Sequence, residues 1–436
     1  MSLPWRSLLL YSLPLLAAAG FWHAAFPIAR EDQDSTKTQI TWLAQISSER
    51  DAQLQLVKDF ERENPDISVR VLWVPPNQYQ VKLKTLLAAG LVPDVFNTGD
   101  IWLAYMLPFL KDLTEFTERD ADDMDLEDFY PDVRNEMFKG GKCFYVPVSM
   151  NVSLLYYNEK LFEDRGVEPP TADWTWSDYI DAGQKLTGMN AEDRQVWGST
   201  ITGGWWGEWL ILVRQAGGEI FSEDGRRCLL DTPEAIEGLT FYADKMLSQK
   251  ISPPAGRGPS TGFASGLYAM SLGGHASSWI TYNQVPGLDW NVQVLPAGPA
   301  GREGGEVALA AYGMASTSKH PEAAWRFIKF LTSPDAMERT GGTGLPVRQS
   351  VAAKTLLAPE RKSHPRDAGI VYEQLKFSRT IPRLPDFIEV TMQIIQPEID
   401  LLLEGRQSPE EAARRATASA NAFLDTLAVE TKGDSR

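Results

Sequence analysis

Two hydrophobic periods alternate through the first part of the chain, and this alternation constrains the fold more than any other feature of the sequence. Strand-like apolar runs fall at residues 39–43, 69–73 and 94–97, and apolar residues at helical spacing lie between them from about 48 to 64 and at 78–89. Such a pattern predicts a mostly parallel α/β sheet, whose ligand crevice lies at the carboxyl ends of the strands. The loops at 45–50 and 97–102 are therefore the first places to look for a binding site.

Chain length and charge narrow the class of protein. A chain of 436 residues is too long for one ordinary core and suits two domains. The formal net charge of -16, with no run of lysine and arginine, argues against nucleic acid and anionic membranes as partners. Only Cys143 and Cys228 are present, which excludes a disulfide framework and a cysteine-based zinc cluster. Two buried thiols are favoured over a single disulfide.

The first 30 residues have the pattern of a secretory signal. Arg6 precedes an apolar stretch at 8–20, and small residues at 18–20 meet the requirement of a cleavage site. The apolar run continues through 21–28, so an uncleaved anchor is the alternative. No cysteine lies near this junction, which excludes the lipid-anchored form. We therefore expect residues 1–30 to be a signal peptide or N-terminal anchor and the protein to be exported to the periplasm.

The rest of the chain contains further predicted elements. Residues 142–158 are rich in aromatic and β-branched side chains, which predicts an extended segment that crosses between lobes. Helices are predicted at 177–187, 233–247, 321–331 and 409–427, the last with the capping-box pair Ser408 and Glu411. The acidic stretch at 118–128 is predicted to be a solvated connector, with a calcium loop as the weaker alternative. Surface loops are predicted at 252–262 and 296–305.

Five segments together carry a family resemblance. They are DVFNTGDIW (94–102), YVPVSMNVSLLYYNEKLFEDRG (145–166), PPTADWTWSDYIDAGQKLT (169–187), KHPEAAWRFIKFLTSPDAM (319–337) and GLPVRQS (344–350). In order and spacing they resemble the extracellular solute-binding proteins of the maltose-binding type, over most of the mature chain. The C-terminal LLLEGRQSPEEAARRATASANAFL is similar to the closing helix of that family.

The resemblance implies a two-lobed α/β fold of the class II periplasmic-binding-protein type. Each lobe would be a mixed, mostly parallel sheet flanked by helices, with a ligand cleft and a hinge between the lobes. Residues 36–150 and 311–365 would form the N-terminal lobe, and residues 151–310 and 366–436 the C-terminal lobe. The implied function is that of a monomeric periplasmic protein that binds a sugar or oligosaccharide and delivers it to the membrane permease subunits of an ABC importer. Because fold analogy alone does not establish function, the site is argued from its residues.

Aromatic residues in the second lobe are the main candidates for sugar binding. A sugar offers an apolar C–H face and a rim of hydroxyls, so its site needs aromatic rings and hydrogen-bonding groups. The run GGWWGEW (203–209) places Trp205 and Trp206 beside glycines, which predicts a loop that presents the rings; burial in the lobe's core is the alternative. The segment AMSLGGHASSW (269–279) resembles the family's glycine turn and adds Gly274, His275 and Trp279.

Further candidates come from the first lobe and from the crossing segments. Asp100 and Trp102 follow a strand at its carboxyl end, and Gln45 lies in the first loop of that kind. The Asp100 carboxylate can accept two hydroxyls, or it can cap the helix that follows. By resemblance the cleft is also bordered by Asn151, Tyr312, Gly313 and Arg348. Asn151 has a backbone-bonding alternative, and Arg348 has a surface ion pair as its alternative.

Other classes of function remain as alternatives. A glycoside-acting enzyme needs two carboxylates about 5 to 9.5 Å apart, and Asp100 and Glu208 are the pair that could be nominated. The sequence lacks zinc-protease, Walker and Rossmann motifs, and its four histidines are scattered, so we expect no enzyme activity, metal or cofactor. A polyol phosphate such as glycerol 3-phosphate, a polyamine, or a chemoreceptor partner would keep the binding fold. The neutral and aromatic candidates favour a carbohydrate.

Overall fold

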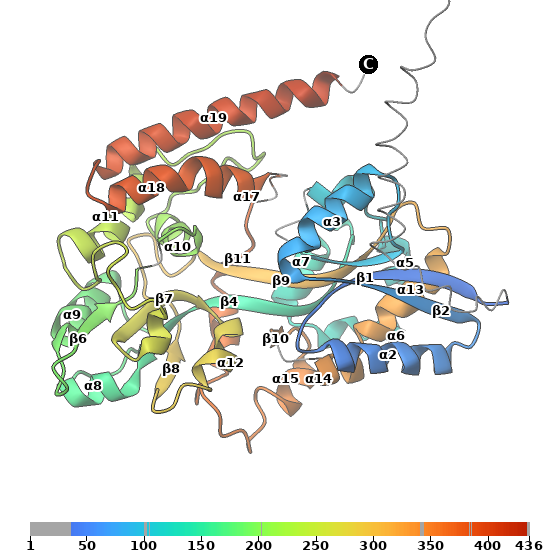
Figure 1. Ribbon diagram of the computed structural model, residues 1–436, viewed down its shortest axis with the longest axis horizontal. Helices are drawn as coiled ribbons and strands as arrows, with labels where there is room; N and C mark the ends of the chain where they lie inside the picture. Colours follow the sequence, from blue (N-terminus) through green and yellow to red (C-terminus); the bar gives the residue numbers. More distant parts are fainter. Residues whose placement is uncertain are drawn as a thin grey trace, which may run out of the picture.

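A computed structural model describes residues 36–99, 103, 105–201, 203–340, 344–382, 384 and 386–433. The predicted signal or anchor at residues 1–30 lies outside these ranges. The molecule is an elongated, two-lobed α/β structure in which one long mixed sheet passes through both lobes (Figure 1). In the part of the chain that is described, every helix is too short or too polar to cross a lipid bilayer.

The first lobe contains the strand and helix alternation that the sequence predicts. Strand β1 (Thr38–Gln45) lies between β2 (Ile67–Val74) and β3 (Val95–Gly99), and both pair with it in parallel. Helices α2 (Arg50–Glu63) and α3 (Pro76–Ala88) connect them. Helix α2 buries Leu56, Val57 and Phe60 at helical spacing, and the Trp42 side chain of β1 is fully buried. The predicted fold class is confirmed for this lobe.

Strand β4 (Val146–Asn158) joins the two lobes, as the extended segment predicts. Its first half pairs antiparallel with β9 (Gly305–Met314), which in turn pairs with β3 of the first lobe. Its second half pairs with β7 (Tyr268–His275) and β8 (Trp290–Gln293) of the second lobe. The central order β3-β9-β4-β7-β6 therefore runs across the whole molecule, with β6 (Gln195–Ser199) beyond β7 (Figure 1).

Helices cover the sheet in both lobes. Helix α11 (Pro233–Leu247) and helix α13 (Pro321–Leu331) have the predicted bounds. Helix α9 (Trp176–Leu186) begins with a capping box between Thr175 and Asp178, and the C-terminal helix α19 (Pro409–Gly433) is longer than predicted. In α19 the Ser408 hydroxyl accepts from the Glu411 backbone N–H at 3.3 Å, but the Glu411 carboxylate binds arginines of its own helix instead of completing the predicted capping box.

The acidic stretch at 118–128 is largely exposed, as predicted, but it is not a simple connector. This stretch folds into helices α5 (Thr114–Arg119) and α6 (Ala121–Met124) and a 3-10 turn, and several of its carboxylates hold other elements. Asp120 accepts from Trp325 Nε1 at 2.7 Å and from Lys329 Nζ at 2.8 Å, both on α13. The pKa of the Asp120 carboxyl lies well below its usual range, chiefly because Arg119 donates to it. The acidic residues are therefore structural contacts, which local composition could not indicate.

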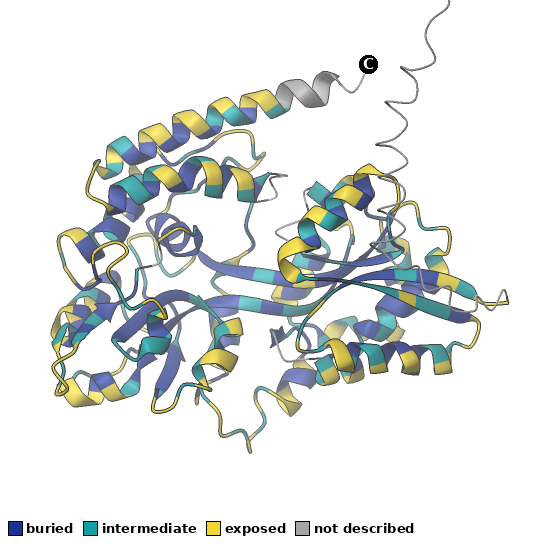
Figure 2. Cartoon of the chain, in the orientation of Figure 1, coloured by how far each residue is buried: buried dark blue, intermediate teal, exposed yellow. Residues whose placement is uncertain are grey.

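Buried side chains form two hydrophobic clusters, and buried segments run through both lobes (Figure 2). The cores do not follow the predicted lobe boundaries, because Tyr156, Trp279 and Trp290 pack in the same cluster as the first-lobe residues. The lobe limits themselves stay a prediction. Both cysteines are free and buried, as predicted, with Cys143 in one cluster and Cys228 in the other. Burial raises the pKa of the Cys143 thiol to about 12 and that of Cys228 to about 11.

Candidate functional site

A polar hollow of about 290 Å³ lies at the carboxyl ends of the first-lobe strands. Its lining includes Gln45, Ser47, Glu49, Asn97, Gly99, Ser149, Ala310, Tyr312, Glu338 and Thr340. Of the predicted ligand residues, Gln45 and Tyr312 therefore lie together here. Strand β9 approaches closely because residue 99 is glycine: a Cβ at Gly99 would lie 2.2 Å from the Leu309 carbonyl oxygen.

Buried aromatic hydroxyl and indole groups hold the strand ends behind this hollow. Tyr79 donates from its hydroxyl to the Asn97 carbonyl at 2.9 Å, and Trp42 Nε1 donates to Asn97 Oδ1 at 3.2 Å. Ser47 and Glu49 belong to the predicted loop at 45–50, so the strand pattern could have identified them. Glu338 and Thr340 come from α14 (Pro334–Thr340), and nothing local to that helix marks them for the site.

Three aromatic side chains of the second lobe, Trp205, Trp206 and His275, lie together and are called the aromatic group. The two tryptophans lie in the segment between β6 and helix α10 (Gly207–Gln215), and His275 ends β7. The indoles of Trp205 and Trp206 lie 5.7 Å apart, and the His275 ring meets Trp205 at 5.5 Å with perpendicular planes. Trp205 is half-buried, whereas Trp206 is buried and packs edge-on against Phe387. Trp205 and Trp206 precede helix α10, so they lie in a loop as predicted, but the end of GGWWGEW is helical because α10 begins at Gly207, directly beneath the Trp205 ring.

Several buried polar atoms around this aromatic group have no hydrogen-bond partner among the described residues. They are Trp206 Nε1, His275 Nε2 and both carboxylate oxygens of Glu306. The His275 Nε2 atom lies 3.7 Å from a Glu306 oxygen, and the Glu306 side chain is only 1% exposed. Since native proteins pair nearly all buried polar atoms, the polar contacts around this group are incomplete in this conformation.

Strands β4 and β9 connect the polar hollow to the aromatic group. On β9 the residues Glu306, Ala308 and Ala310 share one face, because side chains alternate along a strand. Four residues at about 3.4 Å each separate Ala310 at the hollow from Glu306 beside His275, a span of roughly 13 Å. Asn151 of β4 pairs with Ala308, and its Oδ1 accepts from the Ser277 backbone N–H at 3.0 Å.

Four predicted residues make contacts typical of packing. Trp279 is buried in the core and donates from Nε1 to the Tyr156 hydroxyl at 2.7 Å. A Cβ at Gly274 would meet the Tyr156 ring at 2.7 Å, and one at Gly313 would meet Leu110 at 2.5 Å. Arg348 is 2% exposed, and its guanidinium donates to the carbonyls of Met124 and Thr332 and pairs with Asp128. The predicted Asp100 and Trp102 lie outside the described residues.

A second hollow, of about 580 Å³, is lined by helix α7 (Pro131–Met137) of the first lobe and by second-lobe residues. Among the described residues, none of the predicted ligand contacts lines it. Lys139 Nζ donates to the Thr380 hydroxyl at 3.4 Å, and that hydroxyl bonds Glu136 at 3.2 Å. Both hollows border β9: Val307 lines this one, Ala310 lines the first, and Leu309 lines both.

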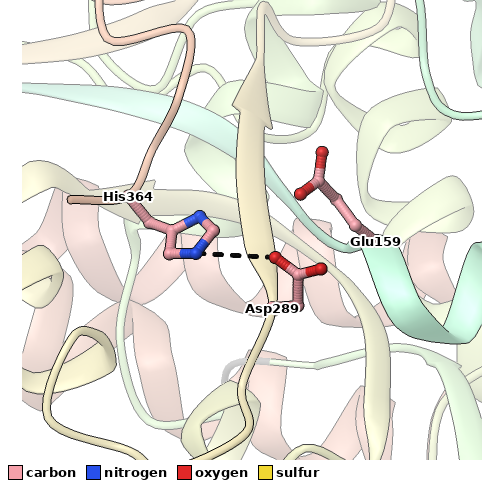
Figure 3. A group of neighbouring side chains, drawn as sticks. All are labelled: Glu159, Asp289 and His364. Carbon is pink, nitrogen blue, oxygen red and sulfur yellow. Dashed lines mark ion pairs between the residues drawn. The ribbon is translucent and has the colours of Figure 1, made fainter. Parts of the chain in front are cut away.

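One cluster on the second lobe brings three potential metal ligands together, which the spacing of the histidines did not indicate. Figure 3 shows Glu159, Asp289 and His364, each of which offers one donor atom within 4.8 Å of the others. Arg366 binds two of them: it donates to the Glu159 carboxylate and to Asp289 Oδ1, the latter at 2.9 Å. With that cation bound to both carboxylates, the cluster fastens the returning chain to the second lobe.

Residues 47–338 match the family described as bacterial extracellular solute-binding protein. A putative binding protein of Brucella abortus is 25% identical over 96% of this chain and 98% of its own length. The arabinooligosaccharide-binding protein of Bacillus subtilis is 27% identical over 68% of this chain and 69% of its own. A solved ABC substrate-binding protein of Listeria monocytogenes, in complex with cycloalternan, is 28% identical, with a TM-score of 0.75 over 89% of this chain and 99% of its own.

The family match spans about two thirds of the chain, and strands β4 and β9 connect its two lobes. The chain therefore belongs to the bacterial extracellular solute-binding proteins. Such proteins serve transport by binding small molecules. Glu208, one of the two carboxylates that a glycosidase reading requires, is fully buried and binds Lys245. It therefore does not face a substrate.

Proposed function

We propose that this protein binds a sugar or oligosaccharide between the first-lobe hollow and the second-lobe aromatic group, as the substrate-binding component of an ABC importer in the periplasm. The observation that carries the proposal is a polar hollow beside β4 and β9, together with a half-exposed indole whose neighbour His275 pairs with β4 and lies beside Glu306 of β9. Indole rings stack on the C–H faces of sugars, and amides, hydroxyls and carboxylates take up their hydroxyls. A relative that binds arabinooligosaccharides and a fold neighbour solved with cycloalternan support this ligand class.

Charge favours a neutral saccharide over a phosphorylated polyol. Among the described residues that line the first hollow are two carboxylates, Glu49 and Glu338, and neither lysine nor arginine. A phosphate needs basic side chains or a cluster of backbone N–H groups, and it would be repelled by these carboxylates. The hydroxyls of a saccharide would instead donate hydrogen bonds to these two carboxylates. We propose transport without catalysis for the same reason, since the nominated Glu208 is not available for acid–base chemistry.

Hinge closure would bring the polar hollow of the first lobe and the aromatic group of the second lobe into contact with the same ligand. Strands β4 and β9 pass between the lobes, so a change of their twist would alter the distance from Gln45 to Trp205. A ligand that contacts both walls favours the closed form by its differential affinity for it, and the permease subunits would recognise that form. The protein would act as a monomer.

Isothermal calorimetry against a panel of arabinotriose, maltotriose, cycloalternan, glycerol 3-phosphate and spermidine tests the proposal. We expect one class of saccharide to bind with near-micromolar affinity, a binding free energy of about -8 kcal/mol. The phosphate and the polyamine should give no binding heat. Small-angle X-ray scattering on the same samples should give a smaller radius of gyration with the saccharide. Binding of the phosphate alone, or no response to any saccharide in a wider panel, would contradict the ligand class.

A further inference from the structure

Two opposite charges are buried together beneath the aromatic group. Lys245 of helix α11 and Glu208 of helix α10 are both 0% exposed, and the Lys245 ammonium donates to Glu208 Oε1. Burying a charged pair is costly, and apolar side chains of similar size would fill the same volume at no such cost. A contribution other than core packing is therefore expected from this pair.

Hydrogen bonds from Lys245 reach both ends of the segment that carries the two tryptophans. Besides Glu208, its ammonium donates to the Thr200 carbonyl at 3.0 Å and to the Ser199 hydroxyl at 3.3 Å. Ser199 and Thr200 stand at the end of β6, and Glu208 stands in the first turn of α10. One buried cation thus fixes the distance between the start and the end of the segment.

Neighbouring groups strengthen this attachment from below. The Ser252 hydroxyl donates to the same Thr200 carbonyl at 3.2 Å, and the Thr200 hydroxyl donates to Ser271 Oγ at 2.9 Å. The Tyr179 hydroxyl bonds Ser199 Oγ, and the Lys245 ammonium lies 5.8 Å from the Tyr179 ring. Every partner is buried, so these interactions are not weakened by water.

The position of the Trp205 ring follows from this attachment. The ring lies against the backbone of Gly207, where a Cβ would be only 2.1 Å from the indole. Because Gly207 and Glu208 are neighbours in the first turn of α10, a shift of Glu208 would move the surface on which the indole rests.

We propose that Lys245 is a positioning residue for sugar binding: by joining Thr200 to Glu208 it holds the aromatic segment in its ligand-binding conformation. The inference rests on the proposed function, and it assigns to the buried pair a role in affinity without contact with the ligand. Preorganisation of this kind raises affinity because less ordering is required on binding.

The test compares two matched double variants of the full exported chain. Lys245→Met/Glu208→Gln removes the pair beneath the aromatic segment, and Arg348→Met/Asp128→Asn removes a buried pair in the first lobe, remote from it. Amide hydrogen exchange needs no ligand, so it separates this inference from the proposed function. We expect exchange at the amides of Thr200 and Leu210, which donate to the Met270 and Trp206 carbonyls, to be about tenfold faster in the first variant and unchanged in the second.

Affinity provides the second readout. For arabinotriose, maltotriose or cycloalternan, whichever binds the wild type, the Lys245→Met/Glu208→Gln variant should bind about fivefold or more weakly, and the first-lobe variant should bind as the wild type does. If the first variant does not fold, Ser252→Ala removes a single donor to Thr200 and should accelerate the same amides roughly two- to tenfold. Unchanged exchange at Thr200 and Leu210 in a folded variant, or an equal loss of affinity in both variants, would overturn the inference.

Discussion

Different kinds of contact fix the binding residues in the two lobes. In the first lobe the polar hollow is formed by strand ends that Tyr79 and Trp42 hold through Asn97, and the buried Arg348–Asp128 pair does not line it. In the second lobe the aromatic group lies on a segment between β6 and α10, and the charged pair that holds it is directly underneath. The first-lobe side is thus held at strand ends by neutral hydrogen bonds, whereas the second-lobe side is held by a buried ion pair.

This difference predicts that substitutions in one lobe change the stability of the protein and substitutions in the other change its affinity for ligand. Damage to charged contacts in the first lobe should lower the free energy of unfolding and leave the ligand geometry intact. Damage beneath the aromatic segment should lower affinity. Four substitutions test the separation, beginning with the largest expected effect.

Arg348→Met should destabilise the protein strongly. Its guanidinium donates to three backbone carbonyls and pairs with Asp128, and the change leaves a nearly buried carboxylate without its cation. We expect a loss of about 3 to 5 kcal/mol in the free energy of unfolding, measured in urea, with unchanged affinity for a bound sugar. A large loss of affinity in the folded variant would place Arg348 at the ligand and break the comparison.

Trp205→Ala should cost about 2 kcal/mol in binding, a roughly thirtyfold rise in Kd by calorimetry. The ring is half-buried and rests on Gly207, so its removal should affect folding little. The control is Trp279→Phe, which removes a hydrogen bond to Tyr156 within the core. The control should lower the thermal midpoint without weakening binding, and the reverse pattern would exchange the roles of the two tryptophans.

Asp120→Asn should lower stability by about 1.5 to 3 kcal/mol near neutral pH, because Arg119, Lys329 and Trp325 all donate to this carboxylate. The pKa of the carboxyl is lowered in the folded state, so its contribution is fully present above the unfolded value of about 3.9 and is lost as pH falls below it. Urea titrations at pH 7, 4 and 3 should show the wild-type and variant stabilities converging. A constant difference across this range would contradict the assignment.

Gln45→Ala should have the smallest effect, about 1 kcal/mol in binding or roughly a fivefold rise in Kd, as for the loss of one hydrogen bond. Gln45 lines the polar hollow at the end of β1 and is only half-buried. Thermal unfolding should be unchanged. An effect larger than that of Trp205→Ala would mean that the polar wall, and not the aromatic one, dominates affinity.

Much of the fold could be predicted because its signals are local. The apolar spacing of Leu54, Val57 and Phe60 and the proline at the start of α11 identify their helices without reference to the rest of the chain. The start of α10 was missed because the glycines beside Trp205 and Trp206 resemble a loop, while the packing of the helix against α11 is a tertiary effect.

It was harder to predict which candidate residues lie at the binding site, because this depends on tertiary packing and not on local sequence. Gln45 could be placed because strand ends in a parallel sheet meet at one edge. Whether an indole lies in a core or at a hollow depends on segments far away in the chain, as with Trp279 and Tyr156, which are 123 residues apart. The Glu208 and Lys245 pair, 37 residues apart on different helices, has no signature in either helix alone.

The two buried sulfurs make this chain convenient for optical measurement. With a pKa of about 12 for Cys143 and about 11 for Cys228, both remain protonated at neutral pH and react slowly with maleimides. Exposed side chains such as Val81 on one lobe and Ile280 on the other could be exchanged for cysteine and dye-labelled while the native thiols stay in place. Single-molecule energy transfer between the dyes would then follow the bending of an otherwise unaltered backbone in real time.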